Sequence, residues 1–551
     1  MQFNLADLFE SVVDKIPEKE ALVVRGQKRW TYQELDHEAN RLAHFLLSRG
    51  VGVGNHVGMH MYNGSEYVVA VLACLKIRAV PININYRYVA DELRYLYNDA
   101  DLVAVVVDVE FGDRLAAVAA ETPKLRTVVS VGGRLPSAVS YEAVSYEEAL
   151  SAQSSDRDGL LPSGPRSAHD LYIIYTGGTT GMPKGVMWRH EDIFYAGMAG
   201  GRPYGEPMKH PAEIADSIDP AAGQLATFPV APLMHGAAQL ATFISFNMGH
   251  KVVLNRKFDA RDVLLTVAEE KANVISMVGD AMGRPLAEAL AGPLAGTDVS
   301  SLIVVSSAGA ILSETVREQL QSQLPGVLIR DNFGSTESGF NGDAAPGTGP
   351  AGGMRFTVNE RTTVYLDEEK RPATPGDGKV GHVAQHGNVP LGYYNDPVKT
   401  AETFFEHDGR RWVLLGDLGT LEADGSVAVL GRGSQCINTG GEKVFPEEVE
   451  AVLKSHPGVF DAIVAGAPDE RFGNRVAAVV QLRTEAAGTG TGADTDAPTD
   501  AELEEFCRSR LSGYKVPRLL IRVADIRRSP SGKPDYPWAK DLVTRAVRGP
   551  S

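Results

Sequence analysis

Short apolar segments alternate with longer amphipathic ones through the middle of the chain, and this alternation constrains the fold more than any other feature. The segments typical of buried strands are LYIIY (171–175), VVL (252–254), VISMV (274–278) and LIVVS (302–306). Residues 260–271 and 313–323 have apolar side chains at helical spacing. Strands that alternate with helices build largely parallel sheets covered by helices. We therefore predict an α/β fold.

The first third of the chain continues this pattern. Residues 31–48 have helical spacing, and Thr31 with Glu34 is typical of a capping box at the helix start. Residues 68–73 and 103–109 are apolar runs that indicate buried elements. Residues 131–170 are polar and rich in Gly, Ser and Pro, which is typical of a surface excursion.

A chain of 551 residues is too long for one ordinary core, and its texture changes after Arg432. We predict an N-terminal domain of stacked α/β sheets over residues 1–431 and a small, mobile α+β domain over 432–551. The elements expected in the second domain are a helix at 444–456, strands at 459–468 and 476–482, a mobile loop at 485–500 and a last helix at 503–511.

Composition excludes several classes of protein. The formal net charge of −16 argues against a nucleic-acid binding surface, which needs a basic face. Cys74, Cys436 and Cys507 lie too far apart in the sequence to suggest a disulfide framework or a zinc site. The first twenty residues lack the layout of a signal peptide, and no apolar run reaches the length of about 20 residues that spans a bilayer. These features indicate a cytoplasmic protein without a transmembrane segment.

The segment YTGGTTGMPKG (175–185) is the strongest local motif. It follows a predicted strand and combines glycines, threonines and Lys184. Backbone N–H groups, hydroxyls and one ammonium in such a loop can bind phosphate. The spacing of a Walker loop is absent, so this is a different kind of phosphate loop.

Three further motifs carry charged or aromatic groups. In DNFGSTESG (331–339), Phe333 can stack on a base and Glu337 can hold Mg²⁺ on phosphates. A hairpin through Asp424-Gly425 would bring Asp417 beside Arg432, where they can contact a ribose. Lys533 lies in the Pro/Gly-rich segment RRSPSGKPDY (527–536), and a solvated surface lysine is the alternative there.

Three histidines differ in context. His235 follows the apolar stretch FPVAPLM, where it can face a substrate, whereas His190 and His456 are expected to be structural.

Taken in order, these segments resemble the adenylate-forming superfamily of acyl-CoA synthetases, luciferases and peptide-synthetase adenylation domains. The likeness rests on the phosphate loop (176–185), SAGA (307–310), FGSTE (333–337), GDLG (416–419), GRGSQCINTGGEKV (431–444) and PSGKPD (530–535). The six motifs occur in the right order, and the match in order and spacing extends over nearly the whole chain.

The resemblance implies a role for each motif. Lys533, Thr336, Glu337 and His235 would be the catalytic group, with Glu337 also holding Mg²⁺ and Ser434 acting as the hinge. The residues implied in ATP binding are Thr176, Gly178, Thr179, Thr180, Gly181, Lys184, Ala308, Gly309, Asp331, Phe333, Gly334, Ser335, Asp417 and Arg432. The implied substrates are ATP, a small-molecule carboxylic acid and CoA, and the sequence leaves a homodimer open.

Within the superfamily, the chain resembles actinobacterial ligases for steroid side-chain acids and related terpenoid acids. GVMWRHEDI (185–193), GDAMGRPL (279–286) and the segment 431–450 carry that likeness. It implies an acyl wall of Met234, Gly236, Ala237, Val278 and Gly279, whose small residues leave room for a bulky apolar acid. The alternative is that these small residues only permit close backbone packing.

Two positions depart from the family pattern. Gly177 stands where the family commonly has Ser, and Ser434 stands where many relatives have Asp or Lys. Because Ser434 is the implied hinge, an enzyme that hands its acyl-AMP to a separate thiolation partner is one alternative. A medium- or long-chain fatty acyl-CoA synthetase and a catalytically silent nucleotide-binding homologue are two others.

Overall fold

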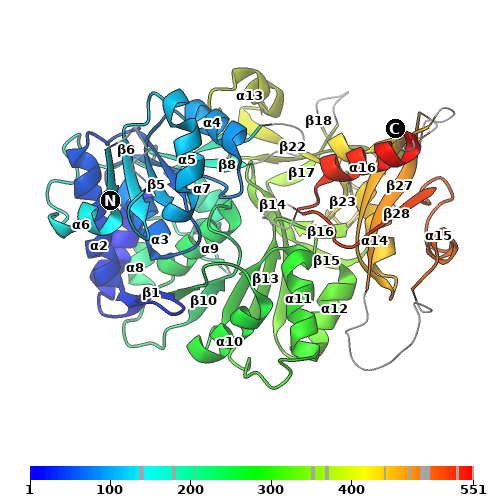
Figure 1. The fold of residues 1–551 in the computed structure, drawn as a ribbon, viewed down its shortest axis with the longest axis horizontal. Helices are drawn as coiled ribbons and strands as arrows, with labels where there is room; N and C mark the ends of the chain where they lie inside the picture. The colour runs from blue at the N-terminus through cyan, green and yellow to red at the C-terminus, as the bar shows by residue number, and fades with distance from the viewer. Residues whose placement is uncertain are drawn as a thin grey trace.

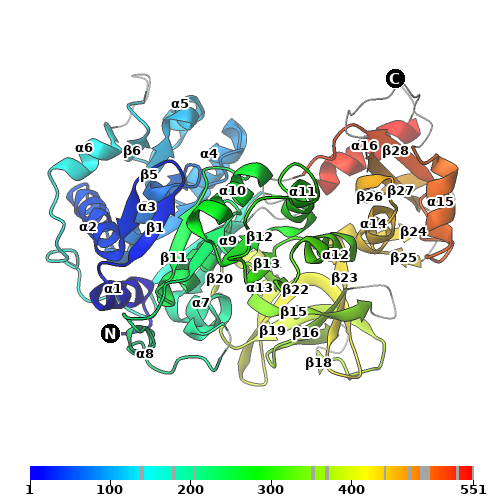
Figure 2. The ribbon, with the colours of Figure 1, turned by 90° about the horizontal axis from the view of Figure 1, so that it is seen from below.

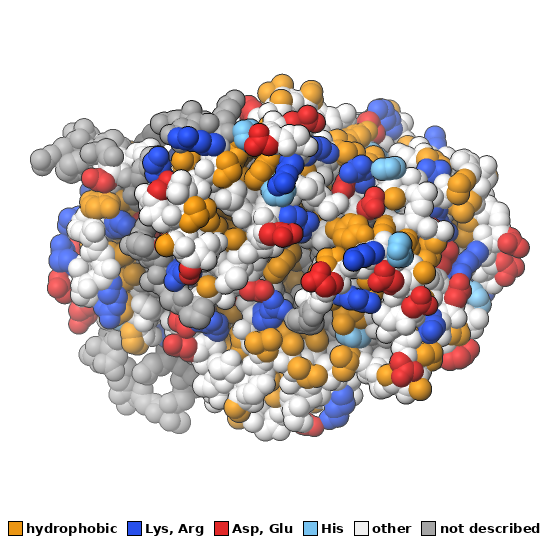
Figure 3. Space-filling model, turned by 180° about the vertical axis from the view of Figure 1, so that it is seen from behind, with side chains coloured by type: hydrophobic (Ala, Val, Ile, Leu, Met, Phe, Trp, Pro, Cys, Tyr) orange, Lys and Arg blue, Asp and Glu red, His pale blue; other side chains and the backbone are white. Residues whose placement is uncertain are grey.

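The computed structural model is an elongated α/β molecule in which the N-terminal half of the chain and the C-terminal segment lie at opposite ends (Figure 1). The residues that it describes are 1–135, 142–176, 182–203, 205–348, 354–366, 371–439, 442–469, 473–483, 497–528 and 533–548. No helix in these ranges is long and apolar enough to cross a membrane. On the face shown in Figure 3, basic and acidic side chains are intermingled.

The first sheet has eight strands in the described residues, in the order β20-β9-β8-β4-β3-β5-β6-β7. The strands are β3 (His56–His60), β4 (Val80–Asn83), β5 (Leu102–Asp108), β6 (Thr127–Val131), β7 (Glu142–Ser145), β8 (Leu171–Thr176), β9 (Lys184–Arg189) and β20 (Gly392–Tyr393). From β8 to β7 every pairing is parallel. β8, β9 and β20 are antiparallel neighbours.

Helices cover both faces of this sheet. One face packs on α4 and α5, and the other packs on α3 and α6. The helices of this half are α1 (Leu5–Lys15), α2 (Tyr32–Ser48), α3 (Ser65–Lys76), α4 (Ala90–Asp99), α5 (Gly112–Val118), α6 (Tyr146–Ser151), α7 (His190–Gly197), α8 (Glu213–Asp216) and the 3₁₀ turns η1 (Val109–Phe111), η2 (Ala119–Glu121) and η3 (Ala199–Gly201).

The second sheet combines a parallel part with an antiparallel part. Its order is β18-β17-β19-β22-β23-β16-β15-β14-β13-β12-β10-β11-β1-β2, with β21 beside β22. The strands are β1 (Glu20–Val24), β2 (Arg29–Thr31), β10 (Ala226–Pro229), β11 (Lys251–Leu254), β12 (Val274–Met277), β13 (Val304–Ala308), β14 (Leu328–Ser335), β15 (Gly339–Thr348), β16 (Met354–Val358), β17 (Thr362–Leu366), β18 (Arg371–Pro372), β19 (Val380–His386), β21 (Phe404–His407), β22 (Arg410–Leu421) and β23 (Val427–Arg432).

The parallel part of the second sheet runs from β1 through β11, β10, β12 and β13 to β14. The helices that follow its strands are α9 (Gly236–Asn247), α10 (Ala260–Glu270), α11 (Gly279–Ala291) and α12 (Glu314–Gln323); α13 (Pro397–Thr403) comes later in the chain. Figure 2 shows α11 between this sheet and the C-terminal segment.

The C-terminal segment has its own apolar clusters, drawn from residues between Ile437 and Val543. Its described elements are η4 (Gly433–Gln435), β24 (Ile437–Thr439), β25 (Glu442–Val444), α14 (Pro446–Lys454), β26 (Val459–Asp469), β27 (Gly473–Leu482), α15 (Asp500–Arg508), β28 (Leu519–Val523) and α16 (Tyr536–Arg548). β26, β27 and β28 form a three-stranded sheet.

The structure confirms the α/β fold class with stacked sheets and a small C-terminal α+β unit. Thr31 caps α2 in the capping box that the sequence predicts, because its hydroxyl accepts from the Glu34 N–H and the Glu34 carboxylate accepts from the Thr31 N–H. One expectation is wrong: the helix near 503–511 is not the last one, since α16 follows it. Most of the predicted mobile loop at 485–500 lies outside the described residues.

Candidate functional site

The carboxyl ends of the parallel strands β10, β12, β13 and β14 meet along one edge of the second sheet. Four motifs emerge at that edge: Met234-His235 after β10, Val278-Gly279 after β12, Ala308-Gly309 at the end of β13, and Thr336-Glu337 after β14. Ligands of open α/β sheets bind outside such strand ends. The edge therefore brings the predicted acyl wall, adenine segment and Mg²⁺ carboxylate together.

The phosphate loop joins the antiparallel strands β8 and β9, and Thr176 lies directly opposite Lys184. Of the predicted phosphate contacts, Gly178, Thr179, Thr180 and Gly181 fall outside the described residues, as does Gly177. Lys184 forms an ion pair with Asp396, and its ammonium lies 5.9 Å from the centre of the Tyr393 ring. The lysine thus has an anionic partner at the foot of the loop.

Thr336 and Glu337 lie in the tight turn of the β14–β15 hairpin. The Trp188 indole donates to the Thr336 carbonyl at 3.0 Å and thereby ties this turn to β9. The Tyr393 hydroxyl donates to Glu337 Oε1 at 3.1 Å.

Glu337 is a suitable ligand for Mg²⁺. Its second oxygen, Oε2, accepts no hydrogen bond from the described part of the chain. No group of three or more His, Cys, Asp or Glu in those residues could hold a metal ion. Mg²⁺ binds through one or two carboxylates together with substrate phosphates, so a single carboxylate at this place fits it.

Phe333 and Asp331 lie deeper than a surface loop would place them. Phe333 is 9% exposed and stacks on Phe356, with 4.9 Å between ring centres. Adenine could contact only the part of the ring that Phe356 leaves open. Burial raises the pKa of Asp331 to about 7, although hydrogen bonds from the Leu312 N–H and Ser307 oppose it.

The predicted ribose pair is brought together. Asp417 on β22 is the register partner of Arg432 on β23, and the turn between the strands contains Asp424 and Gly425. Gly425 has φ +82°, a value that glycine tolerates best. Asp417 as a whole residue is 9% exposed. The side chains of Arg432 and Ser434 are outside the described set, so the structure gives only their backbone positions.

His235 lies just before α9, and Lys533 of the C-terminal segment is near enough for its charge to act on the ring. Burial, together with the positive charges of Lys533 and Arg87, lowers the pKa of His235 to about 3. Within the described chain, the buried His235 Nε2 has no hydrogen-bond partner. A buried polar atom of this kind usually pairs with a ligand or an ordered water. The other two histidines have contacts within the protein: the Nδ1 atom of the buried His190 accepts from the Leu5 N–H, and His456 packs on Phe506.

The residues of the predicted acyl wall lie in different environments. Met234 and Val278 are buried, whereas Gly236 and Ala237 at the start of α9 are half-exposed. A Cβ atom on Gly279 would lie 2.5 Å from the Ile311 carbonyl oxygen, and this glycine has φ +47°. Gly279 therefore permits close backbone packing, which is the alternative that the sequence left open. A larger residue at this position would clash with the backbone, so it cannot be used only to fill a substrate pocket.

Comparison with known proteins agrees with this geometry. The family model described as AMP-binding enzyme matches residues 9–394, and the model of its C-terminal domain matches residues 448–533. The chain belongs to the AMP-binding enzyme family. The resemblance inferred from the six motifs is thereby confirmed.

Curated relatives of this AMP-binding enzyme match over nearly its full length. A protein of Rhodococcus rhodochrous named 3-oxocholest-4-en-26-oate–CoA ligase is 46% identical over 98% of this chain and 96% of its own. A protein of Mycobacterium marinum named medium/long-chain-fatty-acid–CoA/3-oxocholest-4-en-26-oate–CoA ligase is 45% identical, with the same coverage. These names match the actinobacterial steroid-acid ligases that the sequence resembles.

Solved structures share the fold. The anthranilate CoA ligase AuaEII with anthranoyl-AMP has a TM-score of 0.82 at 23% identity, covering 99% of this chain and 98% of its own. ATP-bound MatB from Rhodopseudomonas palustris has a TM-score of 0.78 at 24% identity, covering 98% of this chain and 99% of its own.

Sequence reasoning missed two residues that organise the site of this AMP-binding enzyme. The Asn83 amide donates to the Tyr175 carbonyl at 2.8 Å and to the Met234 carbonyl at 2.7 Å, which ties the phosphate loop to the acyl wall. Tyr393 contacts both Lys184 and Glu337. Asn83 is a polar residue within the otherwise apolar run PINI (81–84) of a buried strand. This feature of the sequence could have identified it.

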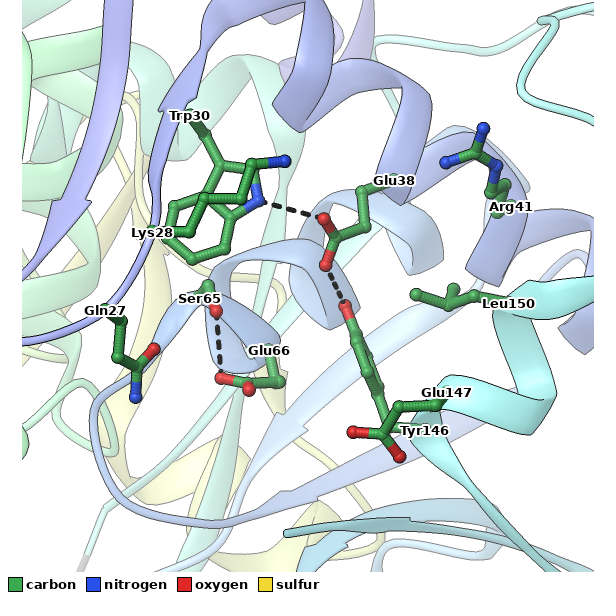
Figure 4. Close-up of a pocket in the computed structure, with 10 residues that line it drawn as sticks. All are labelled: Gln27, Lys28, Trp30, Glu38, Arg41, Ser65, Glu66, Tyr146, Glu147 and Leu150. Carbon is green, nitrogen blue, oxygen red and sulfur yellow. Dashed lines mark hydrogen bonds between the residues drawn. The ribbon is translucent and has the colours of Figure 1, made fainter.

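A surface hollow of about 370 Å³ lies away from these motifs, between β2, α2, α3 and α6. In Figure 4 its carboxylate Glu38 accepts from the Trp30 indole and from the Tyr146 hydroxyl, both at 2.9 Å. Both Glu38 oxygens are thus satisfied within the protein, as expected of a structural contact.

Proposed function

We propose that this chain is an AMP-forming acyl-CoA synthetase, which activates a carboxylic acid with ATP and then transfers the acyl group to CoA. The observation that carries the proposal is the 45–46% identity, over 98% of the chain, to relatives named CoA ligases. The site supports it, because three charged residues from distant segments of the sequence lie near groups at one sheet edge. They are Lys184, Lys533 and Glu337.

The first step joins two anions. The substrate carboxylate attacks the α-phosphorus of ATP, a new O–P bond forms, and the bond from the α-phosphorus to the departing pyrophosphate breaks. Lys184 at the phosphate loop and Lys533 near His235 would offset the charge that accumulates in this transition state. Glu337 would hold Mg²⁺, which offsets phosphate charge when bound.

His235 would contact the substrates as a neutral imidazole. Because its pKa is about 3, the ring carries no charge near neutral pH, and the nearby Lys533 stays the cation of the site. A neutral Nε2 can donate or accept a hydrogen bond without titrating between pH 6 and 8. We assign it an orienting role toward the carboxylate or the acyl-phosphate oxygens.

The three parts of the nucleotide would contact different segments of this site. Thr176 and the glycine-rich loop would bind its phosphates, Ala308 and Gly309 the adenine, and Asp417 with Arg432 the ribose. In the second step the CoA thiol attacks the acyl carbon and AMP leaves. A domain of residues 432–551 turning about Ser434 would separate the two steps, and the distinct apolar clusters of that segment support such a unit.

The acid is proposed to be bulky and apolar, in the class of steroid side-chain acids. The names of the relatives include 3-oxocholest-4-en-26-oate, and the predicted acyl wall has the small residues Gly236 and Ala237 where α9 begins. A rigid acid loses less conformational freedom on binding than a linear one of similar carbon count.

The deciding experiment compares 3-oxocholest-4-en-26-oate with a linear long-chain fatty acid, each with ATP and Mg²⁺, with and without CoA. We expect pyrophosphate release and acyl-AMP without CoA, thioester with CoA, and a higher kcat/KM for the steroid acid. Acyl-AMP without any thioester would favour the alternative of a separate thiolation partner. No pyrophosphate from either acid would contradict the proposal, and a faster linear acid would reject only the substrate class.

A further inference from the structure

We propose that Tyr393 is a positioning residue that joins the two charged groups proposed to bind the triphosphate, Lys184 and Glu337. The inference rests on the function proposed above and adds a residue that none of the six motifs contains. Lys184, Glu337 and Tyr393 lie on segments far apart in the sequence, yet Tyr393 contacts both of the others.

The hydroxyl group makes the first contact. It donates to Glu337 Oε1 at 3.1 Å and leaves Oε2 for a ligand. A hydrogen bond to a charged acceptor restricts the rotation of the carboxylate. Together with the Trp188 bond to the Thr336 carbonyl, it holds the turn of the β14–β15 hairpin against β9 and β20.

The ring makes the second contact. The Lys184 ammonium lies 5.9 Å from the ring centre, within the range of a cation–π interaction. The ion pair of Lys184 with Asp396, three residues after Tyr393, also holds the ammonium. Asp396 is fixed in turn, because it caps α13 by accepting from the Lys399 N–H at 2.9 Å.

Tyr393 is itself immobilised. It is 7% exposed, its N–H donates to Thr400 Oγ1 at 2.9 Å, and its ring packs edge-on against Phe404. On β20 it is the register partner of Val186, two residues after Lys184. One rigid side chain thus sets the separation of a phosphate-binding cation and a metal-binding carboxylate. Such preorganisation lowers the cost of assembling the site when the nucleotide binds.

The neighbouring Tyr394 provides a matched control. Its hydroxyl donates to Asp101 at 2.9 Å, and its ring packs on His56 instead of contacting Lys184 or Glu337. Tyr394→Phe therefore removes the same atom from the next residue of the chain.

The test measures ATP binding by calorimetry, with and without Mg²⁺, for the parent protein, Tyr393→Phe and Tyr394→Phe. Tyr393→Phe keeps the ring, so metal-free ATP binding should stay within about twofold of the parent. The gain in ATP affinity that Mg²⁺ gives should fall roughly tenfold, because the variant loses a hydrogen bond to a charged group. Tyr393→Leu removes the ring as well and should also weaken metal-free binding, by roughly threefold. Tyr394→Phe should match the parent in both conditions.

A parent-like Mg²⁺ gain in Tyr393→Phe, or an equal loss in Tyr394→Phe, would overturn this role while leaving the proposed function intact. A parent protein that binds no ATP under either condition would overturn both.

Discussion

At the scale of single residues, the role proposed for Lys533 in adenylation can be tested separately from nucleotide binding. Lys533 approaches His235 from the C-terminal segment, whereas Lys184 and Glu337 belong to the large sheets. We predict that Lys533→Ala loses adenylation by about 10²–10³-fold, because charge stabilisation in the transition state is lost. ATP binding should persist. Pyrophosphate release measures adenylation, and calorimetry measures ATP binding. Unchanged pyrophosphate release would show that Lys533 is only a surface charge.

Gly279 gives a second residue-scale prediction, this time for stability. Gly279→Ala should lower the free energy of unfolding by about 2 kcal/mol or more, since it combines positive φ with a clash against the Ile311 carbonyl. Gly54 has φ +71°, and no atom lies within 4 Å of the place that a Cβ would take there, so Gly54→Ala gives the strain without the clash. Denaturant unfolding of both variants measures the difference, and equal losses would show that the clash relaxes.

Within the candidate site, the sequence predicted the hairpin that pairs two candidate residues, but it did not predict the contacts that surround the others. Asp417 lies opposite Arg432 because an alternating pattern interrupted by Asp-Gly fixes a hairpin register. The contacts of Asn83 and Tyr393 could not be predicted, because they join strands that lie far apart in the sequence. Nor could the packing of Gly279 be predicted, since it depends on the backbone of the loop after β13.

At the scale of elements, a buried ion cluster joins α1, α2 and α3. The fully buried Lys76 ammonium on α3 lies 2.5 Å from Glu10 Oε1 on α1 and 2.6 Å from Asp36 Oδ1 on α2. Arg166 Nη1 adds a contact of 2.7 Å to Glu10 Oε2. Burial tends to raise the pKa of Glu10, but Lys76 and Arg166 outweigh it and lower the pKa from 4.5 to about 2.

This cluster makes the packing of the three helices sensitive to acid. The pKa of Glu10 is lower in the folded state than the ordinary value of 4.5. Its contribution, about 3 kcal/mol, is therefore present above pH 4.5 and is lost as the pH falls toward 2. Glu10→Gln should be less stable at pH 7 and should lose less stability between pH 5 and 3 than the parent.

Denaturant unfolding across that pH range measures the effect, and Glu18→Gln, at an exposed carboxylate just after α1, is the matched control. A parallel pH dependence in Glu10→Gln and the parent would show that the cluster does not titrate on unfolding. Elements such as α2 follow from local pattern and capping, whereas this cluster joins groups from four separate segments that no local pattern connects.

At the scale of the whole molecule, an ion pair and a cation–π contact between described residues join the C-terminal segment to α11. Arg483 pairs with Glu288 of α11 at 3.0 Å, and the Arg284 guanidinium lies 5.5 Å from the centre of the Phe460 ring. Both contacts occur in the arrangement that brings Lys533 near His235. Weakening them should therefore reduce the population of the arrangement suited to adenylation.

Glu288→Arg tests this coupling, because it sets two positive charges against each other at Arg483. A partly exposed ion pair is worth at most about 1 kcal/mol, so we predict a two- to fivefold slower pyrophosphate release. Thioester formation from added acyl-AMP and CoA should not slow, because in the proposed cycle that step follows a rotation of the C-terminal domain away from α11. Adding Arg483→Glu reverses both charges and should restore pyrophosphate release. Equal slowing of both steps, or no recovery in the double variant, would mean that the pair does not select between two domain arrangements.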